Sequence, residues 1–144
     1  MGKLLLKAVG GPFTENLYDE FEAFTDRAEL DVDLIEYDEE VGKVVIHLTR
    51  LPIVPGQKKV FRKITQYVQD RQNKTPCVVI VRNVKSLTRE THFEEASDRK
   101  IQLIFGITIK DNTVFMNSVQ EDRGKNMFRL TIEIESLDIE LRDI

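Results

Sequence analysis

Few residues in this sequence are of the kinds that cross-link a protein or bind metals. It has one cysteine, Cys77, two histidines and no tryptophan among 144 residues. A lone cysteine excludes an intramolecular disulfide, and no paired spacing of Cys and His predicts a zinc site. We therefore expect a domain that folds without disulfides, metals or cofactors in a reducing compartment, the cytoplasm.

Long apolar runs are also missing. No run approaches the roughly 20 residues that cross a bilayer as a helix. The three leucines within residues 1–7 are too few for a signal peptide, and Leu6 stands where myristoylation requires Ser or Thr. Repeats, low-complexity tracts and glycine-rich phosphate loops are absent as well. We expect a soluble protein that makes no contact with a membrane.

Charge is present but unevenly placed. The net charge is −4, yet residues 1–42 hold twelve acids and three bases, and residues 43–112 hold six acids and fourteen bases. A basic middle segment can attract an acidic partner, or it can lie beside the acidic segments of the same chain and be neutralised by them. We favour self-neutralisation.

The length and the apolar pattern predict one domain, residues 1–144, of the α+β class. Most of it is expected to be antiparallel β-sheet, a meander or an open sandwich or roll, with one or two covering helices. A helix is expected over 14–27, where Thr14 fits the N-cap position and an apolar stripe faces the sheet. The expected strands cover 3–9, 29–34, 44–49, 77–84, 101–109, 114–116, 128–134 and 137–141.

The second half of the chain gives three specific predictions. Apolar residues at odd positions over 101–109 predict that this side, which includes Phe105, faces the core. The charged stretch 86–99 predicts a loop. Apolar residues then switch from even to odd positions after residue 134, so a β-bulge or a tight bend is expected around Glu135-Ser136.

Residues 58–71 fit a helix or a strand, and we interpret them as a helix. No nucleic-acid-binding motif accompanies the bases of this segment, and the chain is acidic overall, so a solvated helix face is the simpler interpretation. Binding of nucleic acid or another polyanion through 58–74 stays an alternative. The binding candidates are four clustered bases: Lys58, Lys59, Arg62 and Lys63.

Candidate catalytic groups are isolated along the sequence. His47 lies on the polar side of a predicted strand and His92 lies in the predicted loop, and neither has a neighbour that would activate it. Cys77 opens an apolar run, where burial would raise its pKa and lower its reactivity. We predict no catalytic residue.

Three pairs of acids each fall on one side of a predicted strand. Paired acids can bind hard cations or share acid and base roles. Their alternation with Ile and Leu is, however, typical of a solvated strand face, and this is our prediction. A metal-dependent or hydrolytic enzyme that uses these faces together with His47 stays an alternative. The pairs are Asp31 with Asp33, Glu133 with Glu135, and Asp138 with Glu140.

The C-terminal half contains the segments 78–84 (VVIVRNV), 104–109 (IFGITI) and 128–134 (FRLTIEI). In strand order and in the Asn-Val that ends the first segment, it resembles small β-rich proteins grouped with the immunity proteins of bacterial polymorphic toxin systems. The resemblance implies a non-enzymatic protein that works by occluding a partner. With or without it, the sequence favours a protein-interaction domain whose partner is another protein or a second copy of the chain.

Overall fold

The computed structural model describes residues 2–11, 15–50, 74–93, 101–118 and 126–144. All their strand pairs are antiparallel, which confirms the expected α+β fold dominated by antiparallel sheet. The segment 58–71, which the sequence predicts to be a helix, lies outside the described residues. The elements are β1 (Lys3–Val9), α1 (Glu15–Thr25), β2 (Glu29–Asp38), β3 (Lys43–Arg50), β4 (Thr75–Val81), β5 (Val84–Phe93), β6 (Ile101–Lys110), β7 (Thr113–Ser118), β8 (Asn126–Ile134) and β9 (Asp138–Asp143).

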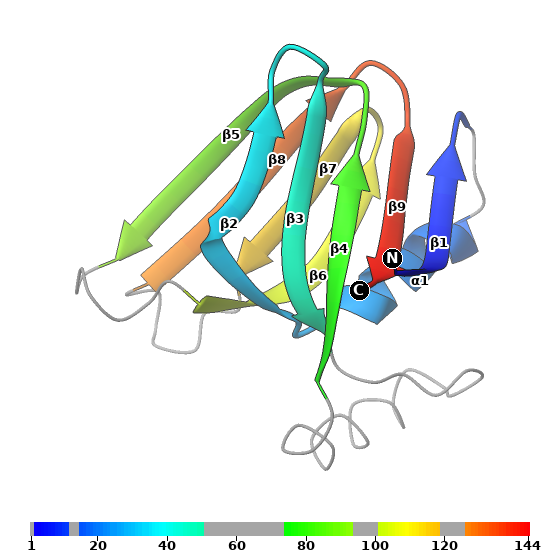
Figure 1. Ribbon diagram of the computed structural model, residues 1–144. Coiled ribbons are helices and arrows are strands. Elements are labelled where there is room, and N and C mark those ends of the chain that lie inside the picture. The colour runs from blue at the N-terminus through cyan, green and yellow to red at the C-terminus, as the bar shows by residue number, and fades with distance from the viewer. Residues whose placement is uncertain (1, 12–14, 51–73, 94–100, 119–125) are drawn as a thin grey trace.

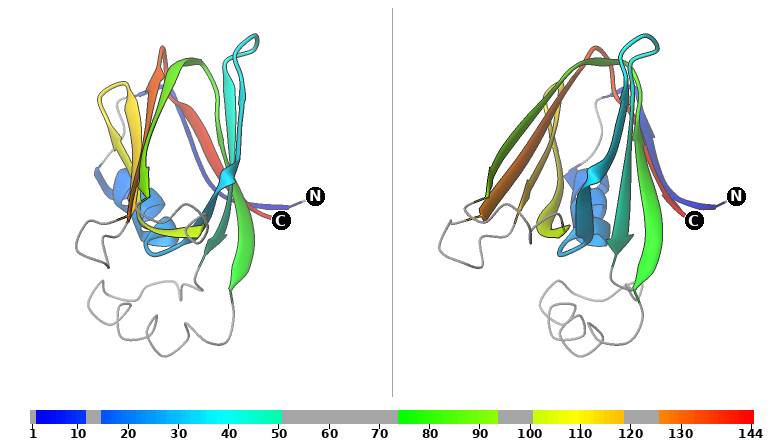
Figure 2. Two further views of the ribbon diagram at one scale, coloured as in Figure 1. Left: turned by 90° about the vertical axis from the view of Figure 1, so that its left-hand side faces the viewer. Right: turned by 60° about the vertical axis from the view of Figure 1, so that its left-hand side comes forward.

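The strands follow the order β1-β9-β4-β3-β2-β6-β7-β8-β5. They form two layers (Figure 1). We call β1-β9-β4-β3-β2 the first sheet and β6-β7-β8-β5 the second sheet; they are joined where Glu29–Asp31 of β2 pairs with β6. Figure 2 shows the two sheets close together at one end and further apart at the other, where α1 lies between them.

The sheets approach each other where the chain crosses from one to the other at two adjacent corners. One corner joins β4 to β5 through Arg82 and Asn83, and the other joins β8 to β9 through residues 135–137. Asn83 has φ 58°, its carbonyl accepts a hydrogen bond from the Glu135 amide at 2.8 Å, and its side chain donates to Ser136 Oγ at 2.9 Å. The bend predicted at Glu135-Ser136 is confirmed, and the change of parity marks a change of sheet.

The loop predicted over 86–99 is wrong in its first half, because β5 continues to Phe93. His92 therefore lies in a strand. β5 pairs with β8 on one side only, and most of its described side chains after Val84 are exposed or half-buried. An edge strand can be polar on both faces, so this strand lacks the apolar alternation that would have indicated it.

The prediction for 101–109 is wrong at Phe105, which is 53% exposed, whereas Ile104 is fully buried. The register of β6 against β7 shifts between Ile104 and Ile107, and Gly106 lies there with φ +105°. A β-bulge adds one residue and so reverses the side that faces the core. A Cβ at Gly106 would lie 2.6 Å from the carbonyl oxygen of Glu22 in α1, so glycine lets the helix approach the strand.

Helix α1 is fixed by its C-terminal end to this bulge. Thr25 Oγ1 donates to the Phe21 carbonyl at 2.6 Å and accepts a hydrogen bond from the Ile107 amide at 2.8 Å. Phe21 is fully buried, and Leu17 and Phe24 pack partly buried against the core, so the predicted apolar stripe is confirmed. The proposed N-cap at residue 14 lies outside the described residues. Among the residues that the structure describes, no helix is long and apolar enough to cross a membrane.

Strand β2 also departs from its predicted alternation. The alternation of Leu30, Val32 and Leu34 with acidic residues predicts one core face for all three, but Leu34 is 49% exposed and Ile35 is buried instead. The register against β3 shifts between Leu30 and Ile35: β2 advances five residues while β3 advances two, from Leu48 to Ile46. An odd excess of residues turns the other side of the strand to the core.

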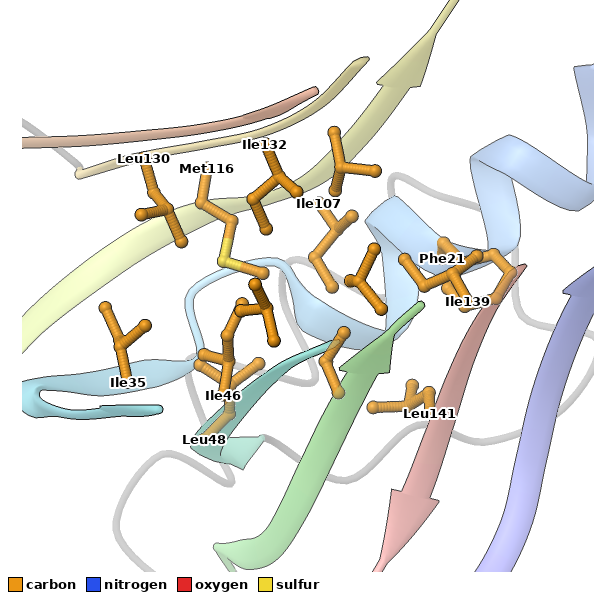
Figure 3. Close-up of a cluster of buried hydrophobic side chains, with 14 of the residues drawn as sticks. Phe21, Ile35, Ile46, Leu48, Ile107, Met116, Leu130, Ile132, Ile139 and Leu141 are labelled. Atoms are coloured by element: carbon orange, nitrogen blue, oxygen red, sulfur yellow. The ribbon is translucent and has the colours of Figure 1, made fainter. Parts of the chain in front are cut away.

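The core lies between the sheets and against α1 (Figure 3). Met116, Leu130 and Ile132 of the second sheet face Ile46 and Leu48 of the first sheet. Phe21 extends from α1 towards Ile139 of β9, so the helix fills the space beside β6. One cluster of buried residues includes side chains from both sheets and the helix, which leaves the opposite side of each sheet uncovered by the other.

Candidate interaction surface

The first sheet has one side on the core and one side away from it. The strand registers place a common set of side chains on the second side, which we call the outer face. This set is mixed in chemistry, with aliphatic residues in the middle and charged residues around them. The outer face consists of Leu4, Lys7 and Val9 of β1, Asp138, Glu140 and Arg142 of β9, Val78, Ile80 and the following Arg82 of β4, Lys43, Val45 and His47 of β3, and Leu34, Glu36 and Asp38 of β2.

The centre of the outer face is apolar because β4 is apolar on both sides. Val79 and Val81 point to the core and are fully buried, whereas Val78 and Ile80 point outward and are half-buried. Val45 lies directly beside Ile80 on β3. A sheet with one solvated face normally alternates apolar and polar residues. The central strand of the first sheet departs from this pattern, as expected for a face that contacts another apolar surface.

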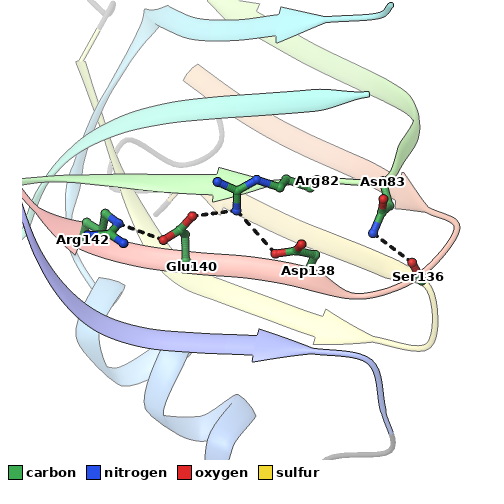
Figure 4. A network of polar contacts seen from close by, with 6 residues as sticks. All are labelled: Arg82, Asn83, Ser136, Asp138, Glu140 and Arg142. Atoms are coloured by element: carbon green, nitrogen blue, oxygen red, sulfur yellow. Dashed lines mark hydrogen bonds and ion pairs between the residues drawn. The ribbon is translucent and has the colours of Figure 1, made fainter. Parts of the chain in front are cut away.

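A charged network lies next to this apolar centre (Figure 4). Glu140 points outward, yet its side chain is only 4% exposed, because Arg82 and Arg142 lie against it. Arg82 Nη1 is 2.6 Å from Glu140 Oε1, and Arg142 Nε donates to Glu140 Oε2 at 2.8 Å. Arg82 also contacts Asp138, with 3.4 Å between Nη1 and Oδ1. The carboxylate therefore holds two guanidinium groups in fixed positions on the surface.

The pKa of Glu140 reflects this environment. Burial acts to raise the pKa of the carboxyl group, but the hydrogen bonds and charges of Arg82 and Arg142 outweigh burial and hold it below its usual value. Glu140 is thus an anion at neutral pH. The solvated face predicted for Asp138 and Glu140 is wrong for Glu140. The partner Arg82 comes from a distant part of the sequence, and only the pairing of β4 with β9 brings it near.

The other acid pairs form no comparable network. The Asp33 amide donates to Asp31 Oδ1 at 2.9 Å within the irregular part of β2. Ser86 Oγ lies 3.3 Å from Glu133 Oε2, whereas Glu135 is exposed at the corner. Among the described ranges, no group of three or more His, Cys, Asp or Glu residues could hold a metal ion.

His47 lies on the outer face, as predicted, and is 40% exposed, with Nε2 3.8 Å from Glu36 Oε2. It borders an open depression of about 240 Å³ that Leu34 and Ile144 also line. Cys77 is fully buried, and burial is the main cause that raises its pKa to about 12. The prediction of a buried, unreactive thiol is therefore confirmed for its burial.

The predicted binding residues Lys58, Lys59, Arg62 and Lys63 lie outside the described residues, so their role stays a prediction. Other cations of the basic middle segment do pair with acids from the flanking segments. This supports the self-neutralisation that we favoured from the sequence. The pairs are Arg50 with Asp143 at 2.7 Å, Lys74 with Glu29, and Arg82 with Glu140.

The two edges of the sheets differ from the outer face. The edge strands are β1 and β5. β1 carries an extra residue between Leu4 and Leu6, and β5 carries one between Val84 and Ser86. Each edge also has exposed lysine, at Lys7 in β1 and Lys85 in β5. Bulges and lysines are features by which proteins prevent strand addition, so a partner that extends either sheet as a further strand is disfavoured.

Comparison with known proteins adds no further argument, because no family model, no curated protein and no solved structure gives a significant match to the chain. Sequence reasoning noted the apolar run Val78–Val81 but gave it no role. The signal was present, since a strand with one solvated face should not be apolar at consecutive positions.

Proposed function

We propose that the chain is a non-enzymatic protein-interaction domain that binds its partner through the outer face of the first sheet. The observation that carries the proposal is the apolar centre, Val78 and Ile80, beside two arginines that Glu140 holds in place. Protein interfaces combine an apolar centre with arginine, and they are depleted in freely moving lysine and glutamate. The side chains of Arg82 and Arg142 remain 37% and 38% exposed, so both can still contact a partner.

Prior ordering of the arginines favours binding. A long side chain that becomes fixed in an interface loses conformational entropy, which costs roughly 0.5–1.5 kcal/mol. Arg82 and Arg142 are already restrained by Glu140, so part of this entropy is lost during folding and not during association. The arrangement is better suited to recognition of a surface than to catalysis, which requires a reactive group that can contact a substrate.

Two narrower roles are part of the proposal. One is the immunity-like role implied by the resemblance of the C-terminal half, in which the chain would occlude a toxin. The other is a cytoplasmic location. The single free thiol of Cys77 favours it, because a chain with one cysteine cannot form the internal disulfide that an oxidising compartment would allow.

Site-specific photo-crosslinking tests the proposal in cells of the source organism. A photoreactive phenylalanine analogue replaces Val45 on the outer face or, as the matched control, Phe105, which is exposed on the second sheet. We expect covalent adducts with a defined protein from position 45 and none from position 105. Mass spectrometry of the adduct identifies the partner.

A second substitution links the adduct to the apolar centre. Ile80→Glu, combined with the photoreactive residue at position 45, should remove the adduct while circular dichroism shows an unchanged fold. The absence of adducts from position 45, or equal adducts from both positions, contradicts the proposal. An adduct that persists with Ile80→Glu contradicts the assigned surface.

A further inference from the structure

We infer that the partner on the outer face is a second copy of this chain, packed face to face about a two-fold axis that runs along β4. The inference rests on the proposed function, since it names the occupant of the same surface. A two-fold axis makes the interface self-complementary, because each contact occurs twice. Sheets that pack face to face lie about 10 Å apart with their strands within roughly 30° of each other.

The strand order determines which strands of the two copies lie opposite each other. β4 is the central strand of the first sheet, between β9 and β3, with β1 and β2 outermost. Rotation about an axis along β4 exchanges the strands on its left with those on its right. It leaves every residue at the same position along the strand direction, which we call its height. β9 of one copy then lies over β3 of the second copy, and β1 lies over β2.

The apolar residues of the face meet each other in this arrangement. Val78 and Ile80 lie on the axis and pack against their own copies. Leu4 of β1 and Val78 of β4 both pair with Arg142 of β9, so they lie at the same height. Leu34 borders the same depression as His47, which pairs with Val78. Leu4 and Leu34, which are 42% and 49% exposed in one copy, therefore lie opposite each other in the pair.

The charges are complementary as well. One row across the sheet contains a cation at one end and an acid at the other. Lys7 and Ile80 both pair with Glu140 of β9. Ile80 and Glu36 both pair with Val45 of β3, so Lys7, Ile80 and Glu36 lie at one height. Lys7 of one copy thus lies over Glu36 of the second copy. A two-fold axis across the strands at this height would instead place Lys7 over Lys7 and Glu36 over Glu36. Like charges in an interface cost several kcal/mol. The axis along β4 brings Arg82 next to its own copy, but Glu140 and Asp138 of the same chain already compensate that cation, whereas Lys7 gains the opposite charge of Glu36 only with this axis.

The total charge of the face also permits self-association. Its cations Lys7, Lys43, Arg82 and Arg142 are matched by the acids Glu36, Asp38, Asp138 and Glu140, and Glu29, Asp31 and Lys74 at one end of the same side add a net charge of −1. The whole chain has a net charge of −4, so a nearly neutral face reduces the repulsion between two copies.

Sedimentation equilibrium from about 1 to 200 μM tests the inference on the full chain. We expect the mass to rise with concentration towards twice the chain mass of 16.7 kDa. Lys7→Glu and Glu36→Lys should each weaken self-association by about tenfold or more, because each creates two like-charge contacts. Phe105→Glu, on the second sheet, should leave self-association unchanged.

Mixing the two charge-reversed variants gives the decisive measurement. In a mixed pair, residue 7 of each copy lies over a residue 36 of opposite charge, so the Lys7→Glu and Glu36→Lys chains should form a heterodimer at concentrations at which each alone stays mainly monomeric. A variant that lost association through misfolding could not be rescued by mixing. Failure of the mixture to associate, with both variants folded by circular dichroism, overturns the inference.

The inference and the proposed function can fail separately. A wild-type chain that stays monomeric up to 200 μM overturns the second copy as occupant. If photo-crosslinks from position 45 then identify a different protein, the proposed function still holds. If position 45 gives no adduct either, both are wrong.

Discussion

Arg82 and Glu140 face each other across the pair β4 and β9, with 2.6 Å between Nη1 and Oε1, on a sheet face that the sequence predicts to be solvated. The contact joins the corner between β4 and β5 to the last strand of the described chain. It orders a surface cation and buries a surface anion at the same time. Its effects on stability can be separated from its effects on binding.

Removal of Arg82 should destabilise the fold moderately. Arg82→Ala removes a charged hydrogen bond to a buried carboxylate, but Arg142 still compensates Glu140, so we expect a loss of about 1–2 kcal/mol in the free energy of unfolding. Urea denaturation measures this loss. Arg129→Ala is the control, because its pair with Glu90 is exposed and 3.6 Å long, and should cost less than about 0.5 kcal/mol. Equal losses would show that the Glu140 network has no special role.

Acid should remove the contribution of Glu140. The pKa of this carboxyl group is lowered from 4.5 in the folded state, so its ionised form adds stability above that pH, and the contribution is lost as the pH falls through the folded pKa. The difference in unfolding free energy between the wild type and Glu140→Gln should be constant from pH 6 to 8 and shrink below about pH 4.5. A constant difference down to pH 3 would contradict this, and Glu39→Gln in the exposed turn provides the control.

The bulge at Gly106 should not accept alanine. Its φ of +105° strains any L side chain, and a Cβ there would lie 2.6 Å from the Glu22 carbonyl oxygen. We expect Gly106→Ala to cost roughly 2–4 kcal/mol and to loosen α1, which amide hydrogen exchange of the helix would show. At Gly11 a Cβ would meet no atom within 4 Å, so Gly11→Ala should be close to neutral. Similar effects at both positions would contradict the close packing of α1 on β6.

The thiol of Cys77 should be inert in the folded protein. It is fully buried and burial raises its pKa to about 12, so little thiolate exists at pH 8. We expect no reaction with iodoacetamide over hours in buffer and rapid reaction in denaturant. A Cys77→Ser chain with Val41→Cys, at a 67% exposed turn position, should react readily without denaturant. Fast labelling of native Cys77 would contradict its burial.

Much of the fold was predictable because most strands of the second half alternate regularly. The bend at Glu135-Ser136 was predictable for the same reason, since a change of parity has few structural solutions. The errors share one cause. At Phe105, Leu34 and the start of β5, the side that faces the core is set by a bulge or by an edge position, and neither leaves a periodic signal in the sequence.

The candidate surface was less predictable than the fold. His47 and Cys77 could be placed from the neighbouring sequence alone, because each lies in a regular strand. Glu140 could not, because its environment depends on Arg82, and only the strand order brings the two together. Val78 and Ile80 were visible as apolar residues, but the side of β4 that stays uncovered depends on which sheets pack together.

The place of β9 has a consequence for how the chain folds during synthesis. β9 is the last strand of the described chain, yet it lies inside the first sheet, between β1 and β4. β1 therefore has no strand to pair with until residues 138–143 have left the ribosome. Until then β4 lacks one neighbour, and the sheet has an unpaired apolar edge that can associate with other chains before the native sheet closes.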